Sequence, residues 1–168
     1  MKIRSLLAAA LLACAALPAA SAENTADTTL TPPVNSAAPP GYLDRARELA
    51  MHALALLGIN YKYGSDSPER GFDCSGLVSH VFQEVAGIVL PRNAQGMSKV
   101  GQKVDKSDLQ PGDLVFFNTR RKDFSHVGIY IGEARFVHAP SRGGEVEIMD
   151  MRGGYWQKRY NGARRVNF

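Results

Sequence analysis

The sequence predicts an α+β fold, in which helices come first along the chain and antiparallel strands follow. Beyond residue 41, apolar residues first recur at spacings of three and four, the period of an amphipathic helix. After Pro111-Gly112 the period changes to two, and glycine-rich turns separate short apolar runs, as expected of strands. Helices followed by a run of strands favour an antiparallel sheet over a doubly wound parallel one.

Three helices are predicted before the strands. The first covers residues 43–57 and the second residues 74–86; each has one apolar face and is followed by a glycine that can end it. A loop with several Gly, Ser and Pro residues joins them over residues 59–73. A shorter helix is expected at residues 93–99. The predicted strands cover residues 113–117, 126–131, 135–139, 145–149 and 163–168.

The N-terminus has the pattern of an export signal. Lys2 and Arg4 form a short basic region, residues 6–17 an apolar one, and residues 20–22 a small-residue cleavage site. The apolar run is well short of the roughly 20 residues that span a bilayer. We therefore expect residues 1–22 to be a signal peptide and the mature protein to be exported to the periplasm.

A second interpretation of the N-terminus is a lipoprotein signal. Residues 11–14 resemble the sequence at which bacterial lipoproteins are cleaved and lipidated on a cysteine, here Cys14, although the leader before it is very short. The protein would then be anchored in the outer membrane. Under either interpretation, residues 23–41, rich in Thr, Pro, Ala and Ser, are predicted to be a flexible linker, and the folded domain to cover residues 42–168.

Composition and charge argue against nucleic acid as a partner. With 168 residues, of which 45% are hydrophobic, the chain is long enough for one modest domain with a core. Its formal charge of +4 includes Lys2 and Arg4, and the remainder is too weakly basic to indicate a nucleic-acid-binding surface. We expect a monomer.

Cys74 stands out because both interpretations of the N-terminus remove or acylate Cys14, the other cysteine. A lone cysteine in an exported protein cannot form an internal disulfide, so it is either an inert core residue or a reactive nucleophile. Asp73 is a plausible N-cap, which would make Cys74 the first helical residue. The helix dipole and the first-turn amides there favour a thiolate and can stabilise an oxyanion. A small buried residue that happens to begin a helix is the alternative.

A thiolate nucleophile needs a base, and His126 and His138 lie on neighbouring predicted strands beside a turn. An odd number of loop residues between the strands puts both histidines on one face of the sheet, and an even number puts them on opposite faces unless a bulge intervenes. One histidine could take the thiol proton while the other orients it. A metal pair and simple sheet filling are the alternatives. His52 and His80, off the apolar helix faces, are predicted to lie at the surface.

Taken together, short blocks along the whole of residues 42–168 resemble the NlpC-type cell-wall peptidases. The blocks occur in the order expected for that family, which is far more specific than any one block. They are Tyr61-x-Tyr63-Gly64, Phe72-Asp73-Cys74-Ser75-Gly76, Leu90-Pro91-Arg92, Pro111-Gly112-Asp113-Leu114-Val115-Phe116-Phe117, Ser125-His126-Val127-Gly128-Ile129-Tyr130 and Phe136-Val137-His138-Ala139.

The resemblance implies a papain-like α+β fold, with N-terminal helices packed on an antiparallel, partly barrel-like sheet. It implies a Cys–His–His centre in which Cys74 is the nucleophile, His126 the general base and His138 the residue that orients His126. Four further positions match residues that lie near the oxyanion or line the substrate cleft: Tyr61, Asp73, Ser75 and Arg92. No metal or organic cofactor is implied, and the expected partner is the peptide stem of peptidoglycan.

The last segment, residues 155–166, is most similar to the small proteobacterial murein endopeptidases of the Spr type. Since those enzymes cut peptidoglycan cross-links, we expect hydrolysis of the D-alanyl–diaminopimelate bond. The alternatives are the γ-D-glutamyl–diaminopimelate bond of the stem, a non-catalytic wall-binding module, and a metal-binding protein. Ser65 stands where the family usually has a second glycine, and the loop over residues 65–72 is slightly long, which leaves substrate preference open.

Overall fold

The computed structural model describes residues 41–119, 122–141 and 143–167. The expected signal peptide, Cys14 and all but the last residue of the expected linker lie outside this range. No helix among the described residues combines the length and the apolar character needed to cross a membrane.

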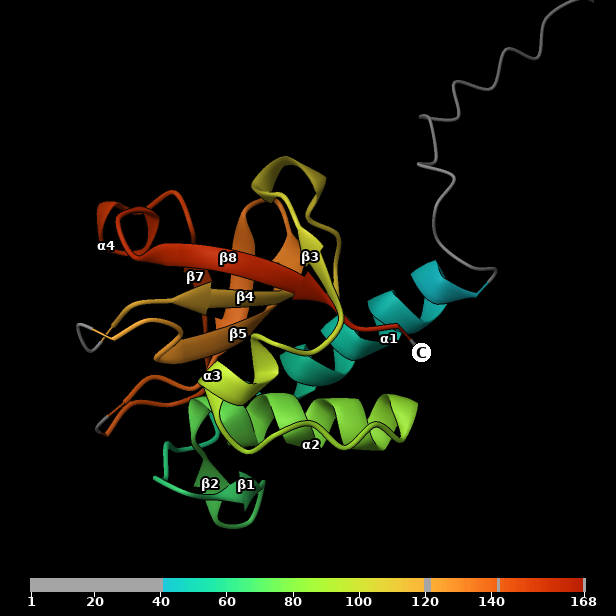
Figure 1. Ribbon diagram of the computed structural model, residues 1–168. Coiled ribbons are helices and arrows are strands. Elements are labelled where there is room, and N and C mark those ends of the chain that lie inside the picture. The colour runs from blue at the N-terminus through green and yellow to red at the C-terminus, as the bar shows by residue number, and fades with distance from the viewer. Residues whose placement is uncertain (1–40, 120–121, 142, 168) are drawn as a thin grey trace, which may run out of the picture. The chain divides into compact units, whose positions relative to one another are not determined.

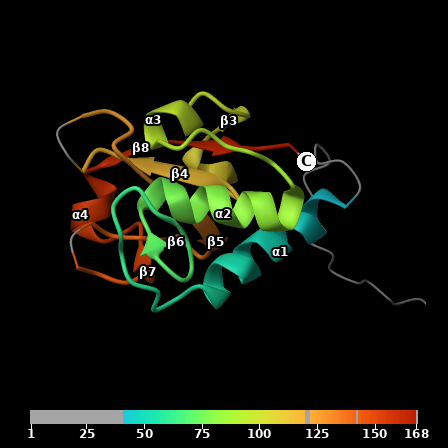
Figure 2. The same ribbon diagram turned by 90° about the horizontal axis from the view of Figure 1, so that it is seen from below.

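Two long helices, α1 (Tyr42–Ala55) and α2 (Cys74–Ala86), lie side by side and pack against the sheet (Figures 1 and 2). The bounds of α2 are those predicted, because its apolar period is bracketed by an N-cap at Asp73 and by Gly87, which ends the helix in the left-handed conformation. The shorter helices are α3 (Ala94–Met97), the 3₁₀ helix η1 (Lys106–Asp108) and α4 (Gly154–Gln157).

The main sheet has six strands, all paired antiparallel, in the order β3-β8-β4-β5-β6-β7. The predicted class of fold, helices on an antiparallel sheet, is therefore confirmed. A separate small hairpin of β1 (Asp66–Ser67) and β2 (Gly71–Phe72) lies in the loop before α2. The strands of the main sheet are β3 (Gln102–Val104), β4 (Leu114–Phe117), β5 (His126–Gly132), β6 (Arg135–His138), β7 (Glu147–Asp150) and β8 (Tyr160–Arg165).

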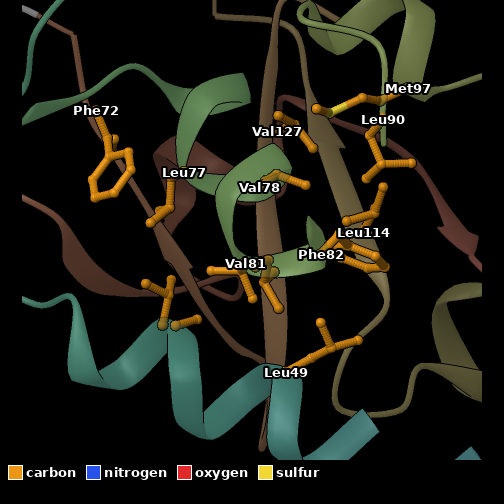
Figure 3. Close-up of a cluster of buried hydrophobic side chains, with 14 of the residues drawn as sticks. Leu49, Phe72, Leu77, Val78, Val81, Phe82, Leu90, Met97, Leu114 and Val127 are labelled. Carbon is orange, nitrogen blue, oxygen red and sulfur yellow. The ribbon is translucent and has the colours of Figure 1, made fainter. Parts of the chain in front are cut away.

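A buried apolar cluster lies on each face of the sheet, and β4 contributes to both. Leu114 and Phe116 join the core between sheet and helices, whereas Val115 and Phe117 join a second cluster on the opposite face. Figure 3 shows the first core, where α2 presents its apolar side to the strands. The second cluster includes Trp156 of α4. The face that carries both catalytic-candidate histidines is this second one.

The turn between β5 and β6 determines the face on which His138 lies. Glu133 and Ala134 form a two-residue turn with positive φ angles of 53° and 58°. This even loop would place the histidines on opposite faces, but a bulge between Tyr130 and Gly132 shifts the register by one residue. The predicted exception therefore applies, and both histidines share a face.

Several predictions from the sequence differ from the structure. The last strand was expected at residues 163–168 but lies at β8, Tyr160–Arg165. His52 and His80 are half-buried, not at the surface, because their rings contact each other between α1 and α2, with centroids 5.9 Å apart. Five short elements were not predicted: β1, β2, β3, η1 and α4.

Candidate active site

Cys74 is the first residue of α2, and the predicted cap precedes it. Asp73 has extended backbone angles, and its Oδ1 accepts a hydrogen bond of 2.6 Å from the amide of Gly76. Its other oxygen, Oδ2, accepts from the amide of Gly64 at 2.9 Å. The carboxylate thus fixes both the start of the helix and the loop that borders it. Cys74 itself is half-buried at this helix N-terminus.

Ser75 and Arg92 brace the same turn. The Ser75 hydroxyl donates to Asp73 Oδ1 at 2.9 Å, and Arg92 Nη2 donates to the carbonyl oxygen of Ser65 at 3.3 Å. Arg92 Nη1 also lies 3.4 Å from Asp73 Oδ1. A side chain at Gly76 would collide with the Ser65 carbonyl, so only glycine fits there. Ser65, the departure from the family pattern, is buried and belongs to this framework through its backbone.

Five of the seven predicted site residues line one cavity of about 800 Å³. They are Tyr61, Asp73, Cys74, Ser75 and Arg92. The cavity is also lined by Ser125, the residue before His126. His126 and His138 line a second cavity, of about 590 Å³. Two consecutive residues, Ser125 and His126, therefore line different cavities.

The two histidines are joined across β5 and β6. Nε2 of His126 and Nδ1 of His138 share a hydrogen bond of 2.9 Å, and the side chains are 6% and 1% exposed. Burial, and secondarily the neighbouring His126, lowers the pKa of His138 from 6.5 to about 3. His138 is therefore neutral at physiological pH. Gly128 permits β5 and β6 to approach closely beside the histidines, since a Cβ at this position would lie 2.7 Å from the carbonyl oxygen of Val137.

Trp156 covers the histidine pair and was not identified as a site residue from the sequence. Its ring centroid lies 5.6 Å from that of His126 and 4.9 Å from that of His138. The residue is 8% exposed and comes from α4, a helix of one turn. No local period marks so short a helix, so the only available signal was a lone Trp in the chain. Its ring packs against both imidazoles and forms part of the wall of the cavity that they line.

The contact between Cys74 and His126 remains a prediction. What supports it is the packing of α2 against β5, together with the shared cavity wall formed by Cys74 and Ser125. A thiol at a helix N-terminus beside an oriented imidazole can perform acyl transfer, because the amides of the first turn stabilise negative charge there.

Comparison with known proteins identifies the family of this chain. The sequence profile of the NlpC/P60 family matches residues 58–165, which span both cavities and most of the sheet. The chain belongs to the NlpC/P60 family. The match covers well over half of the chain and contains all seven predicted site residues.

Several curated relatives in this family carry the same region. Murein DD-endopeptidase MepH of Escherichia coli is 40% identical over 128 residues, which are 74% of this chain and 47% of the relative. Gamma-DL-glutamyl hydrolase of Bacillus subtilis is 46% identical over 120 residues, 71% of this chain and 29% of the relative. The E. coli Murein DD-endopeptidase MepS/Murein LD-carboxypeptidase is 45% identical over 109 residues, 65% of this chain and 56% of the relative. The chain thus matches about half or less of these proteins' lengths.

Solved structures of NlpC/P60 proteins share the fold. An NlpC/P60 family protein from Bacillus cereus is 35% identical with a TM-score of 0.65, covering 72% of this chain and 40% of that one. The NlpC/p60 domain of the peptidoglycan hydrolase SagA is 26% identical with a TM-score of 0.63, covering 72% of this chain and 98% of that one.

Proposed function

We propose that this NlpC/P60 protein is a cysteine peptidase that hydrolyses the peptide stems of peptidoglycan. The observation that carries the proposal is the buried hydrogen bond of 2.9 Å between His126 and His138, in a chain whose Cys74 begins a capped helix. An oriented imidazole and a thiol at a helix N-terminus are the two parts that a thiolate nucleophile needs. The names of the two E. coli relatives, both murein endopeptidases, support the same substrate.

In the proposed mechanism, the ring of His126 acts through Nδ1, because Nε2 is engaged with His138. Nδ1 takes the thiol proton of Cys74, and the thiolate attacks the carbonyl carbon of the stem. Amides of the first turn of α2 and the Tyr61 hydroxyl stabilise the oxyanion. His126 then protonates the leaving amine, which leaves a thioester on Cys74. Water, deprotonated by His126, hydrolyses the thioester and restores the thiol.

We expect Cys74→Ala and His126→Ala each to lower the rate of sacculus digestion at least about 1,000-fold, because each removes part of a unit that acts together. His52→Ala, which alters a histidine outside both cavities, is the matched control and keeps its activity. Iodoacetamide should label Cys74 and abolish activity, whereas a chelator should not. Activity in Cys74→Ala, or loss of activity with the chelator but not the thiol reagent, would contradict the mechanism.

The bond that we favour is the D-alanyl–diaminopimelate cross-link. Cleavage of the γ-D-glutamyl bond in free stems requires a group that reads the stem's N-terminal amine, and Asp73 is the acidic candidate in the cavity. Both of its oxygens already accept backbone amides, from Gly76 and Gly64. The C-terminal segment and the names of the E. coli DD-endopeptidases also favour the cross-link bond. The name of the B. subtilis relative refers to a γ-glutamyl bond, which is the type of bond in the alternative.

Purified cross-linked muropeptide dimers decide between these bonds. The favoured reading predicts monomers with intact four-residue stems, identified by mass spectrometry. Release of muropeptides with dipeptide stems, while the dimers stay linked, would assign the γ-D-glutamyl bond instead. Export to the periplasm and the choice between signal-peptide cleavage and lipidation of Cys14 concern residues outside the described range, and they remain part of the proposal.

A further inference from the structure

Glu147 lies directly opposite His138 in the sheet. The register of β6 and β7 pairs the two residues, so their side chains project from the same face. The Glu147 Oε1 atom is 3.5 Å from Nε2 of His138. The glutamate side chain is 48% exposed, whereas that of His138 is 1% exposed. A half-exposed carboxylate therefore reaches inward to the buried ring.

The hydrogen bond to His126 fixes which nitrogen of His138 carries a proton. When His126 has accepted the thiol proton, both of its ring nitrogens bear hydrogen, and Nε2–H donates to Nδ1 of His138. Neutral His138 must then carry its own proton on Nε2. Among the described residues, no hydrogen-bond partner meets that buried nitrogen, and Glu147 is the acidic group next to it. The Glu147 carboxylate is therefore the acceptor available to this buried N–H group.

We propose that Glu147 is a positioning residue that completes a chain Cys74–His126–His138–Glu147. Its carboxylate accepts the Nε2 proton of His138, holds that ring in the tautomer that His126 requires, and stabilises the imidazolium formed during catalysis. The inference rests on the proposed roles of Cys74 and the two histidines. A separation of 3.5 Å is at the long limit of a hydrogen bond, and a small rotation of the half-exposed side chain closes it.

The other groups around His138 do not serve this purpose. Trp156 from α4 and Phe136 from β6 contribute ring faces and edges, with centroids 4.9 Å and 5.1 Å from that of His138. His126 from β5 holds Nδ1. Asp150 lines the same cavity, but Arg152 Nε donates to its two oxygens at 2.9 Å and 3.0 Å. Of the two acidic residues that line this cavity, Glu147 is therefore the one whose carboxylate can accept the Nε2 proton of His138.

The test compares Glu147→Gln and Glu147→Ala in the full chain, with Glu145→Gln as the matched control. Glu145 is exposed, lies two residues away and carries the same charge, but does not line the cavity of the histidines. Two measurements are made on each variant. One is the kinetics of cross-linked dimer cleavage; the other is ¹⁵N NMR of the histidine rings, which reports the tautomer of His138 and the titration midpoint of His126.

We expect His138 in the wild type to carry its proton on Nε2. Glu147→Ala should lower kcat about 10-fold with KM within about two-fold, because the tautomer is no longer held. In that variant a population protonated at Nδ1 should appear. Glu147→Gln keeps a carbonyl acceptor but no charge, so kcat should fall less than about three-fold, while the His126 midpoint moves to lower pH by roughly half a unit. Glu145→Gln should match the wild type in every measurement.

Two results would overturn the inference. One is a wild-type His138 protonated at Nδ1. The other is a set of Glu147 variants that match Glu145→Gln in kcat, tautomer and His126 midpoint. If instead the wild type fails to cleave any stem bond, or Cys74→Ala is equally active, the proposed function fails. The NMR measurements would still decide the role of Glu147, so the two failures can be told apart.

Discussion

His138 combines two properties that rarely occur together: it is almost completely buried, and its titratable ring is hydrogen-bonded to a second histidine, His126. Burial holds its pKa at about 3, far below the 6.5 of an exposed histidine. The neutral ring can accept a hydrogen bond from His126, which a charged ring could not. The same burial makes folding sensitive to acid, because the unfolded chain gains a proton that the folded one refuses.

The sign of this effect follows from proton counts. Between about pH 6.5 and pH 3 the unfolded state binds more protons at His138 than the folded state, so the free energy of unfolding falls as the pH falls. The contribution of the neutral His138 ring to the free energy of unfolding is fully present above pH 6.5 and is lost progressively as the pH falls to 3. From pH 7 to pH 5 the loss attributable to His138 should be about 2 kcal/mol.

Urea unfolding at a series of pH values, applied to the wild type and to His138→Gln, measures this contribution. Glutamine can still accept from His126 but does not titrate, so the variant's curve of stability against pH should be flatter by about 2 kcal/mol over this interval. The absolute stability of the variant is not the criterion, since the substitution also changes packing. Parallel curves for the two proteins would show that His138 does not titrate as described.

At the scale of elements, the sequence predicted best where period and capping agree. The apolar stripe of α2, its N-cap Asp73 and the closing Gly87 gave both ends of the helix. Strands β4, β5 and β6 were predicted within a residue or so at either end. By contrast, β1, β2, β3, η1 and α4 have two to four residues each, which is too few for any apolar period to emerge.

The candidate site divides in the same way. Cys74 at a helix N-terminus followed from local sequence, because an N-cap acts within one turn. The shared face of His126 and His138 did not follow, because it depends on a bulge that the sequence left as one of two alternatives. Trp156 and Glu147 were missed since their proximity to the histidines arises from the pairing of β6 with β7 and the docking of α4.

At the scale of the whole molecule, one ion pair joins the start of β4 to the end of β8. Asp113 is fully buried; Arg165 Nε donates to its Oδ1 and Nη2 to its Oδ2, each at 2.8 Å. The amide of Gln110 also donates to Asp113. Burial, followed by the charge of Asp113, raises the pKa of Tyr42 at the start of α1 to about 12. Three distant parts of the chain therefore meet around one carboxylate.

We expect Asp113→Ala to lower the free energy of unfolding by roughly 3–5 kcal/mol, because it leaves Arg165 partly buried without its partner. Asp44→Ala breaks an exposed ion pair with Arg47, of 3.7 Å, and should cost less than about 1 kcal/mol. Urea unfolding monitored by circular dichroism compares the two. Equal and small losses would mean that the buried pair contributes no more than a surface one.

The bulge in the β5–β6 hairpin means that the sequence blocks alone do not determine whether His126 and His138 meet. Removing or adding one residue near Ile131 would leave every recognisable block of the sequence intact and in order. It would also move every side chain of the following strand to the opposite face of the sheet. The His138 side chain would then project toward the helices and no longer toward His126. A one-residue change in the length of this hairpin, without a further bulge to restore the register, would therefore separate the two histidines, and the proposed histidine pair would be lost although every block of the sequence was still recognised.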